Sequence, residues 1–233
     1  QLSRFGTVSL DGTKLRANAS KHSALSHGHA EKIEAQLKAE VQEMLKLAEA
    51  ADRSPLPEGI DLPEEIKRRE DRLAAIAAAK AKIEARAKER FEREQAEYEA
   101  KLAKRKAKET ATSKKPGGKP PAAPTAGPRP DDQINLTDDE SRIMKVAGGG
   151  FEQCYNAQAA VDADSMLVLA PRVTQAGNDK EQVAPMVEKV RANPAGLNQP
   201  ATWLADTGYY SEKNVATCVA ADIEPLIAVK RDE

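Results

Sequence analysis

The chain has 233 residues, of which 40% are hydrophobic, 31% charged and only 3% aromatic, and its mean hydropathy is −0.63. With so few aromatic side chains, much of the chain cannot be buried in a packed core. No stretch approaches the roughly 18 consecutive apolar residues that a transmembrane helix needs, so we exclude an integral membrane protein and expect no membrane partner. Two cysteines, Cys154 and Cys218, are too few for a disulfide scaffold or a structural zinc site, which favours a reducing, cytoplasmic location.

The net charge of −1 conceals an uneven distribution along the chain. Residues 1–24 carry four basic side chains and one acid, residues 25–109 carry 19 of each sign, residues 110–130 carry four basic side chains alone, and residues 131–233 carry 9 basic and 17 acidic ones. A basic surface would suit nucleic acid, and an acidic one would suit metal ions. A solvated surface with uneven charge explains the same pattern, and charge alone favours that simpler interpretation by roughly two to one.

The N-terminal region predicts a short strand. Residues 7–10 are good strand formers, and Asp11-Gly12 is a turn signal at the end of that strand. The polar segment that follows contains three histidines without a carboxylate or cysteine partner at ligand spacing: His22, His27 and His29. We give a metal site at these histidines roughly one chance in ten.

Two helices are predicted next. Residues 30–51 repeat apolar side chains at three- and four-residue steps, which is typical of an amphipathic helix. Three prolines and a glycine then break the pattern, and Asp61 with Glu64 forms a capping-box signature for a second helix from about Pro63 to Lys108. A helix of this length with so thin an apolar stripe predicts an antiparallel helical hairpin.

Residues 110–130 are rich in proline, glycine and lysine, and they contain no apolar side chain larger than alanine. Nothing offsets the entropy cost of ordering such a segment, so we predict a flexible tether.

The last hundred residues or so alternate between strand and helix patterns. Strands are predicted at Glu152–Val161, Met166–Thr174, Ala201–Ala205 and Pro225–Val229, with helices starting at Asp179 and after Ser211. The first two strands form a hairpin, and the later alternation predicts an α/β core with parallel strand pairing.

Two acids, Asp11 and Asp206, lie at the C-terminal ends of predicted strands. In open α/β sheets, ligands bind outside the carboxyl ends of the strands. Two carboxylates there can hold divalent cations, and two metals roughly 4 Å apart can activate a nucleophile and stabilise a leaving oxygen in phosphoryl transfer. For either aspartate alone, an ordinary turn residue is favoured by roughly four to one, so the pair by itself is a weak signal.

Three segments together resemble the DDE-class transposases of bacterial insertion sequences. Val8–Ser20 resembles the first-aspartate segment of that family, Phe151–Asp162 its second strand, and Leu204–Ser211 its second-aspartate segment. Any one segment would be a modest signal, but the three in this order are specific. The resemblance implies an α/β protein with an RNase H-like mixed sheet and helices, interrupted by a long α-helical hairpin insertion.

The resemblance also implies a division of the chain. Residues 1–24 would contain the first strand of the RNase H-like core with Asp11, and residues 25–109 the helical, coiled-coil hairpin insertion. Residues 110–130 would be a disordered linker. Residues 131–233 would form the remainder of the core, truncated before its last catalytic helix.

The activity implied is metal-dependent DNA strand cleavage and strand transfer during transposition. Asp11 would be the first metal-binding acid and Asp206 the second, with Mg²⁺ or Mn²⁺ at a two-metal site in the complete protein. A metal-activated water would attack a phosphodiester at the transposon end, and the freed 3′ hydroxyl would then attack target DNA. The partners implied are DNA at the transposon ends and at the target, and a homo-oligomer is compatible with the sequence.

Several side chains near these acids have two interpretations. Lys14 and Arg16 could contact DNA phosphates, and a solvated strand exit is equally supported. Tyr209 and Tyr210 could stack on a base, although one of them is expected in the core. Trp203 is expected in the core, and the two cysteines are expected to be inert thiols.

The third acid of the family is a Glu on a later helix, in a segment carrying Tyr, Arg, Glu and Lys at set spacings. No Tyr occurs beyond Tyr210, and Glu224 and Glu233 are not placed to replace that Glu. Because Gln1 is also not an initiator Met, we expect a partial copy that lacks the third acid. Two alternatives stay open: a non-catalytic helical interaction module built on residues 30–108, and a decayed transposon remnant without activity.

Overall fold

The computed structural model of the protein divides the chain into two compact units. Residues 1–23 and 137–233 form one, here called the sheet unit, and residues 24–136 form the other, the helical unit. The residues that the structure describes are 6–51, 61–113, 117–193 and 200–229. Within these ranges no helix combines the length and the apolar character that crossing a bilayer requires.

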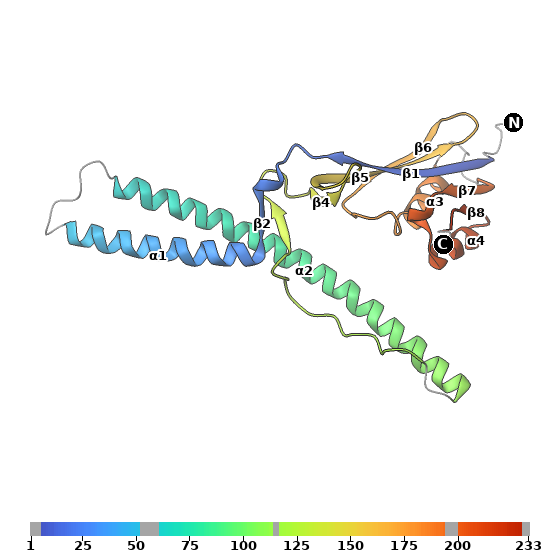
Figure 1. Ribbon diagram of the computed structural model, residues 1–233, viewed down its shortest axis with the longest axis horizontal. Helices are drawn as coiled ribbons and strands as arrows, with labels where there is room; N and C mark the ends of the chain where they lie inside the picture. Colours follow the sequence, from blue (N-terminus) through green and yellow to red (C-terminus); the bar gives the residue numbers. More distant parts are fainter. Residues whose placement is uncertain (1–5, 52–60, 114–116, 194–199, 230–233) are drawn as a thin grey trace. The chain divides into compact units, whose positions relative to one another are not determined.

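A six-stranded mixed sheet forms the centre of the sheet unit (Figure 1). Its strands are β1 (Thr7–Arg16), β4 (Arg142–Lys145), β5 (Phe151–Asp162), β6 (Val168–Thr174), β7 (Thr202–Ala205) and β8 (Glu224–Ile227). β5 pairs antiparallel with β1 along one edge and with β4 and β6 along the other, while β1, β7 and β8 are parallel neighbours. The chain is therefore a mixed α/β protein, and the predicted β5–β6 hairpin and parallel pairing are both confirmed.

The first strand is longer than the sequence predicts. A turn was expected at Asp11-Gly12, but β1 continues through both residues to Arg16. The reason is β5, which pairs with β1 without interruption from Val8↔Asp162 to Arg16↔Cys154. The predicted turn is therefore wrong, because pairing with a long partner strand outweighs the local turn preference of Asp-Gly.

Two helices cover one face of the sheet, α3 (Val183–Arg191) and α4 (Glu212–Ala220). They share a core with the strands that contains Val8, Leu10, Ala160, Met186, Val187, Val190, Trp203 and Cys218. As predicted, Ser211 caps α4, with its hydroxyl accepting a hydrogen bond from the Asn214 amide at 3.1 Å. The helix expected from Asp179 begins only at Val183, and the part of its predicted end at residues 194–196 lies outside the described residues.

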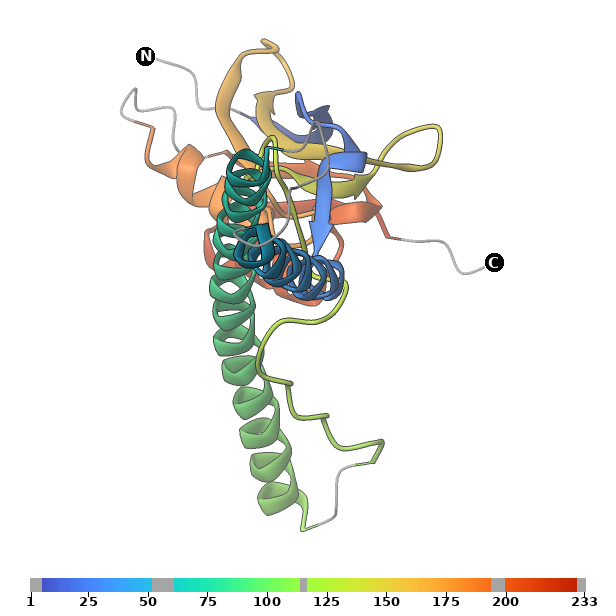
Figure 2. The same ribbon diagram turned by 90° about the vertical axis from the view of Figure 1, so that its left-hand side faces the viewer.

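The helical unit contains α1 (His27–Ala51) and α2 (Leu62–Thr112), which lie side by side (Figures 1 and 2). Lys80 Nζ lies 2.8 Å from a Glu34 oxygen, and Arg69 Nε lies 2.9 Å from Glu40, so the two helices run in opposite directions. Asp61 caps α2 as predicted, accepting a hydrogen bond from the Glu64 amide at 3.2 Å. The apolar seam between the helices includes Leu37, Ile76, Ala79 and Ile83.

The segment predicted to be a linker has two parts. Residues 110–112 belong to α2, which corrects the boundary, whereas residues 117–130 have no helix or strand and run beside the second half of α2 (Figures 1 and 2). The Arg105 guanidinium donates hydrogen bonds to carbonyl oxygens of residues 117–119, each at 3.3 Å. Two short strands that the sequence analysis missed, β2 (Ala24–Ser26) and β3 (Gln133–Asn135), pair with each other in this unit.

Candidate functional site

Asp11 and Asp206 each directly follow the last paired residues of two neighbouring strands, β1 and β7. β1 and β7 are parallel, and their last paired residues are Leu10 and Ala205. Asp11, which lies inside β1 and not at its end, and Asp206, which directly follows β7, are the next residues on the two segments, so both lie near the carboxyl end of β7, where the parallel pairing stops. The carboxyl ends of parallel strands are the usual ligand-binding edge of α/β sheets.

Both carboxylates are exposed and make local backbone hydrogen bonds. Asp206 Oδ1 accepts from the Gly208 amide at 2.8 Å and thereby caps the 3-10 turn η2 (Thr207–Tyr209). Asp11 Oδ1 accepts from the Gly12 amide at 2.7 Å. Exposed carboxylate oxygens are the donors that Mg²⁺ and Mn²⁺ prefer, so the chemistry of this pair fits such an ion.

A third carboxylate, which the sequence analysis assigned to a helix start, lies at the same end of the sheet. A Cβ atom at Gly208 would lie 3.0 Å from Asp206 Oδ1 and 3.9 Å from Asp179 Oδ2, so both carboxylates border that glycine. Asp179 Oδ1 accepts hydrogen bonds from Asn156 Nδ2 at 2.7 Å and from Gln158 Nε2 at 2.8 Å. These contacts fix the Asp179 carboxylate beside the turn that follows Asp206.

A buried chain of hydrogen bonds connects these elements. The Tyr209 hydroxyl donates to Gln158 Oε1 at 2.6 Å, and Gln158 Nε2 also donates to Asn156 Oδ1 at 2.9 Å. Burial, followed by the negative charges of Asp179, Asp11 and Asp206, raises the pKa of Tyr209 far above its ordinary value. The hydroxyl therefore stays protonated and remains a donor at neutral pH.

The structure also shows the burial and the contacts of the other side chains that the sequence singled out. Tyr209 is 1% exposed and Trp203 is fully buried, which confirms that both belong to the core, whereas Tyr210 is 38% exposed. Lys14 Nζ lies 3.3 Å from Asp179 Oδ1, and Arg16 is exposed. DNA contacts of Lys14 and Arg16 stay a prediction.

Asn156 and Gln158 were not predicted as site residues, although the sequence of β5 carries a signal for them. Alternate residues of this strand face the core, and this buried series contains Cys154, Asn156, Gln158 and Ala160. A strand with one buried face ordinarily places apolar side chains at such positions. Two amides in succession within the buried series therefore mark a polar network.

Neither the histidines nor the cysteines form a metal centre. Among the described residues, no group of three or more His, Cys, Asp or Glu side chains is arranged to hold a metal ion. Burial raises the pKa of both the Cys154 and Cys218 thiols, which disfavours the reactive thiolate. The two acids at the sheet edge are thus a pair rather than a closed cluster.

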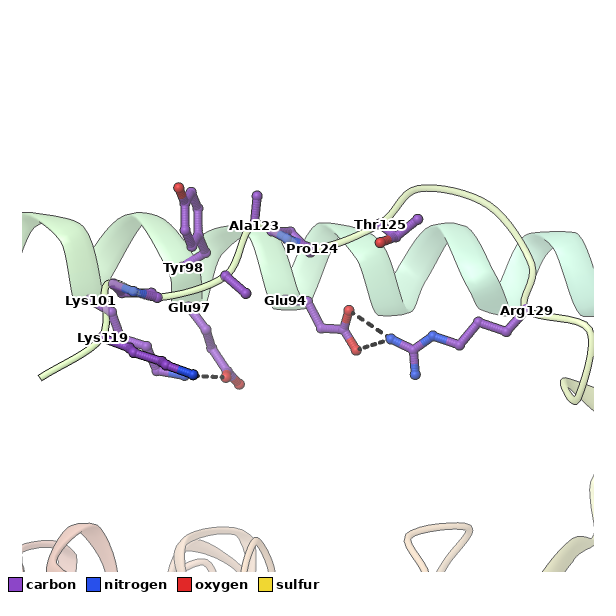
Figure 3. Close-up of a pocket in the computed structure, with 11 residues that line it drawn as sticks. Glu94, Glu97, Tyr98, Lys101, Lys119, Ala123, Pro124, Thr125 and Arg129 are labelled. Carbon is purple, nitrogen blue, oxygen red and sulfur yellow. Dashed lines mark hydrogen bonds and ion pairs between the residues drawn. The ribbon is translucent and has the colours of Figure 1, made fainter.

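The helical unit has a pocket between α2 and residues 117–130 (Figure 3). It has a volume of 510 Å³, and its lining combines small and proline residues with charged side chains such as Glu97, Lys101 and Lys119. Arg129 pairs with Glu94 at one side of this pocket, with a nitrogen–oxygen distance of 3.2 Å. These contacts hold residues 117–130 against the helix, and Asp11 and Asp206 are not among the lining residues.

Comparison with known families identifies the C-terminal half of the chain. Residues 118–233 match the model of the transposase DDE domain, and through this region the chain belongs to the DDE-class transposases. Asp206 and β5 lie inside the match, whereas Asp11 precedes it. No curated protein and no solved structure matches the chain. The family gives the protein a transposition-related function, and its members typically use divalent metal ions.

Proposed function

We propose that the sheet unit is the RNase H-like catalytic core of a transposase that cleaves DNA at transposon ends and joins it to target DNA. The strand order β6-β5-β1-β7-β8, with an antiparallel first part and a parallel second part, supports this proposal because it is the order expected of an RNase H-like sheet. In the same reading, the helical hairpin within residues 25–109 is an insertion after the first strand.

The observation that carries the proposal is the register of β1 and β7, because Asp11 and Asp206 directly follow the paired residues Leu10 and Ala205. In our proposal these two carboxylates hold Mg²⁺ or Mn²⁺ and orient the scissile phosphodiester. A bound divalent ion would lower the pKa of a water molecule and stabilise the leaving oxygen. Lys14 and Arg16, on the same strand as Asp11, are proposed to contact DNA phosphates, and Lys14 would exchange its Asp179 partner for a phosphate.

Thermal unfolding with and without Mn²⁺ tests the proposed metal pair. The wild-type chain should gain on the order of 5 °C in Tm at Mn²⁺ concentrations well above a millimolar dissociation constant, because a ligand that binds only the folded state stabilises it. Asp11→Asn and Asp206→Asn should each abolish this gain. Asp222→Asn is the matched control, since it removes the same charge from an exposed residue of the same unit. An equal gain in all four proteins would refute the site.

A further inference from the structure

The hydrogen bond between Tyr209 and Gln158 connects the turn after Asp206 to the strand that pairs with the Asp11 segment. Tyr209 is the last residue of η2, the turn that Asp206 caps. Gln158 lies on β5 directly opposite Gly12, the residue after Asp11, and accepts the Tyr209 hydrogen bond at 2.6 Å. The turn after Asp206 is thus attached to the strand that pairs with the Asp11 segment.

Gly12 leaves the space that this connection needs. A Cβ atom at position 12 would lie 2.1 Å from Gln158 Nε2, 2.9 Å from Gln158 Cδ and 3.0 Å from the Tyr209 hydroxyl oxygen. Any other residue would therefore push the Gln158 amide away from its partners. A glycine inside a strand is otherwise unfavourable, and close approach by another group is a physical reason for one there.

The polar groups of this connection are buried and satisfied. Asn156, Gln158 and Tyr209 are each at most 2% exposed, and each makes side-chain hydrogen bonds within the network. Asn214, also 2% exposed, donates from Nδ2 to the carbonyl oxygens of Tyr209 and Lys180, both at 2.7 Å. A fully satisfied buried network holds its members in one arrangement, because each lost bond leaves an unpaired polar group in the core.

We propose that Tyr209 and Gln158 are positioning residues, whose hydrogen bond fixes the Asp206 turn beside the Asp11 segment. The consequence for metal binding rests on the proposed function, in which the two carboxylates act together on one site. The effect of this hydrogen bond on the turn after Asp206 does not depend on metal binding, so the two effects can be measured separately.

Tyr209→Phe removes only the hydroxyl of this connection. Its matched control is Tyr155→Phe, because Tyr155 lies on β5, the strand that carries Gln158, and its hydroxyl donates a hydrogen bond to Asp138 at 2.8 Å. Amide exchange measured by NMR should become on the order of ten-fold faster at Gly208 and Tyr209, whose amides donate to Asp206, in Tyr209→Phe alone. Mn²⁺ affinity should fall several-fold in this variant and stay at the wild-type value in the control.

Gly12→Ala provides a second route to the same result, since the added methyl group displaces the Gln158 amide while the Tyr209 hydroxyl remains. It should accelerate exchange at the same two amides, and it keeps the test available if Tyr209→Phe fails to fold. Wild-type exchange rates at both amides in either folded variant would overturn the proposal. If the wild type binds no Mn²⁺, the proposed metal function fails, and the exchange rates alone then decide whether Tyr209 and Gln158 position the turn.

Discussion

Different kinds of internal contact stabilise the sheet unit and the helical unit. In the sheet unit, β1 pairs with strands that lie far away in the sequence, and the core encloses Trp203 and a satisfied polar network. In the helical unit, a narrow seam of Leu, Ile and Ala side chains is flanked by partly exposed ion pairs such as Glu34–Lys80. The sheet unit therefore fixes polar side chains in its core, whereas the polar contacts between the two long helices of the helical unit remain accessible to solvent beside a buried apolar seam.

The largest expected effect concerns the core of the sheet unit. Leu10 is 2% exposed and lies on β1 between β5 and β7. Leu10→Ala should lower the free energy of unfolding of the sheet unit by about 2–5 kcal/mol, because it removes buried methyl groups and leaves a cavity. The chain has a single tryptophan, Trp203, so its fluorescence during urea unfolding reports on this unit. An unchanged fluorescence midpoint would contradict the assignment of Leu10 to the core.

A smaller effect is expected at the helical seam. Ile83 is 1% exposed, and Ile83→Ala should cost the helical unit about 2–3 kcal/mol, near the lower end for such substitutions, because a two-helix seam can partly close around the gap. Circular dichroism at a helix-sensitive wavelength follows this unit, which contains the two long helices. Leu102→Ala, at a 39% exposed position of α2, is the control and should change stability by less than about 0.5 kcal/mol.

These two substitutions together test whether the units are stabilised independently. If they are, Leu10→Ala shifts the fluorescence transition and leaves the helical transition in place, and Ile83→Ala does the reverse. A common shift of both transitions by either variant would show that the units unfold together. The sheet unit and the helical unit would then differ in their kinds of contact but not in independent stability.

Local signals predicted the parts of the fold that depend on neighbouring residues. The caps at Asp61 and Ser211 were expected from the sequence, and both accept the capping hydrogen bond. The strand at β5 and the strands and helices after it were also predicted, since the pattern of each element lies within about ten residues.

Features that depend on a distant partner could not be predicted in the same way. The length of β1 is set by β5, so the Asp11-Gly12 turn signal was misleading. Asp179 looks like a helix start in the sequence, but its carboxylate is held by Asn156 and Gln158 from another element. Asp11 and Asp206 were singled out from their places after predicted strands and then from the family resemblance, but only the register of β1 and β7 shows that they follow paired residues of neighbouring strands.

The smallest expected effect concerns the ion pairs of the helical unit and appears only at acid pH. Hydrogen bonds from Lys38 at 2.6 Å and from Lys80 at 2.8 Å lower the pKa of Glu34 to about 2, against burial, which raises it. An acid whose pKa is lower in the folded state contributes stability above its unfolded pKa of 4.5, and this contribution disappears as the pH falls toward about 2.

The helical unit of the wild type should therefore lose stability between about pH 4.5 and pH 2, and Glu34→Gln should show a shallower loss over the same interval. Urea unfolding followed by circular dichroism across this range measures both slopes. Glu43→Gln, at an exposed position of the same helix, is the matched control and should keep the wild-type slope. Added salt should reduce the difference, because partly exposed ion pairs are screened. Equal slopes in all three proteins at low salt would mean that the Glu34 ion pairs do not stabilise the helix pair, leaving the apolar seam to hold it.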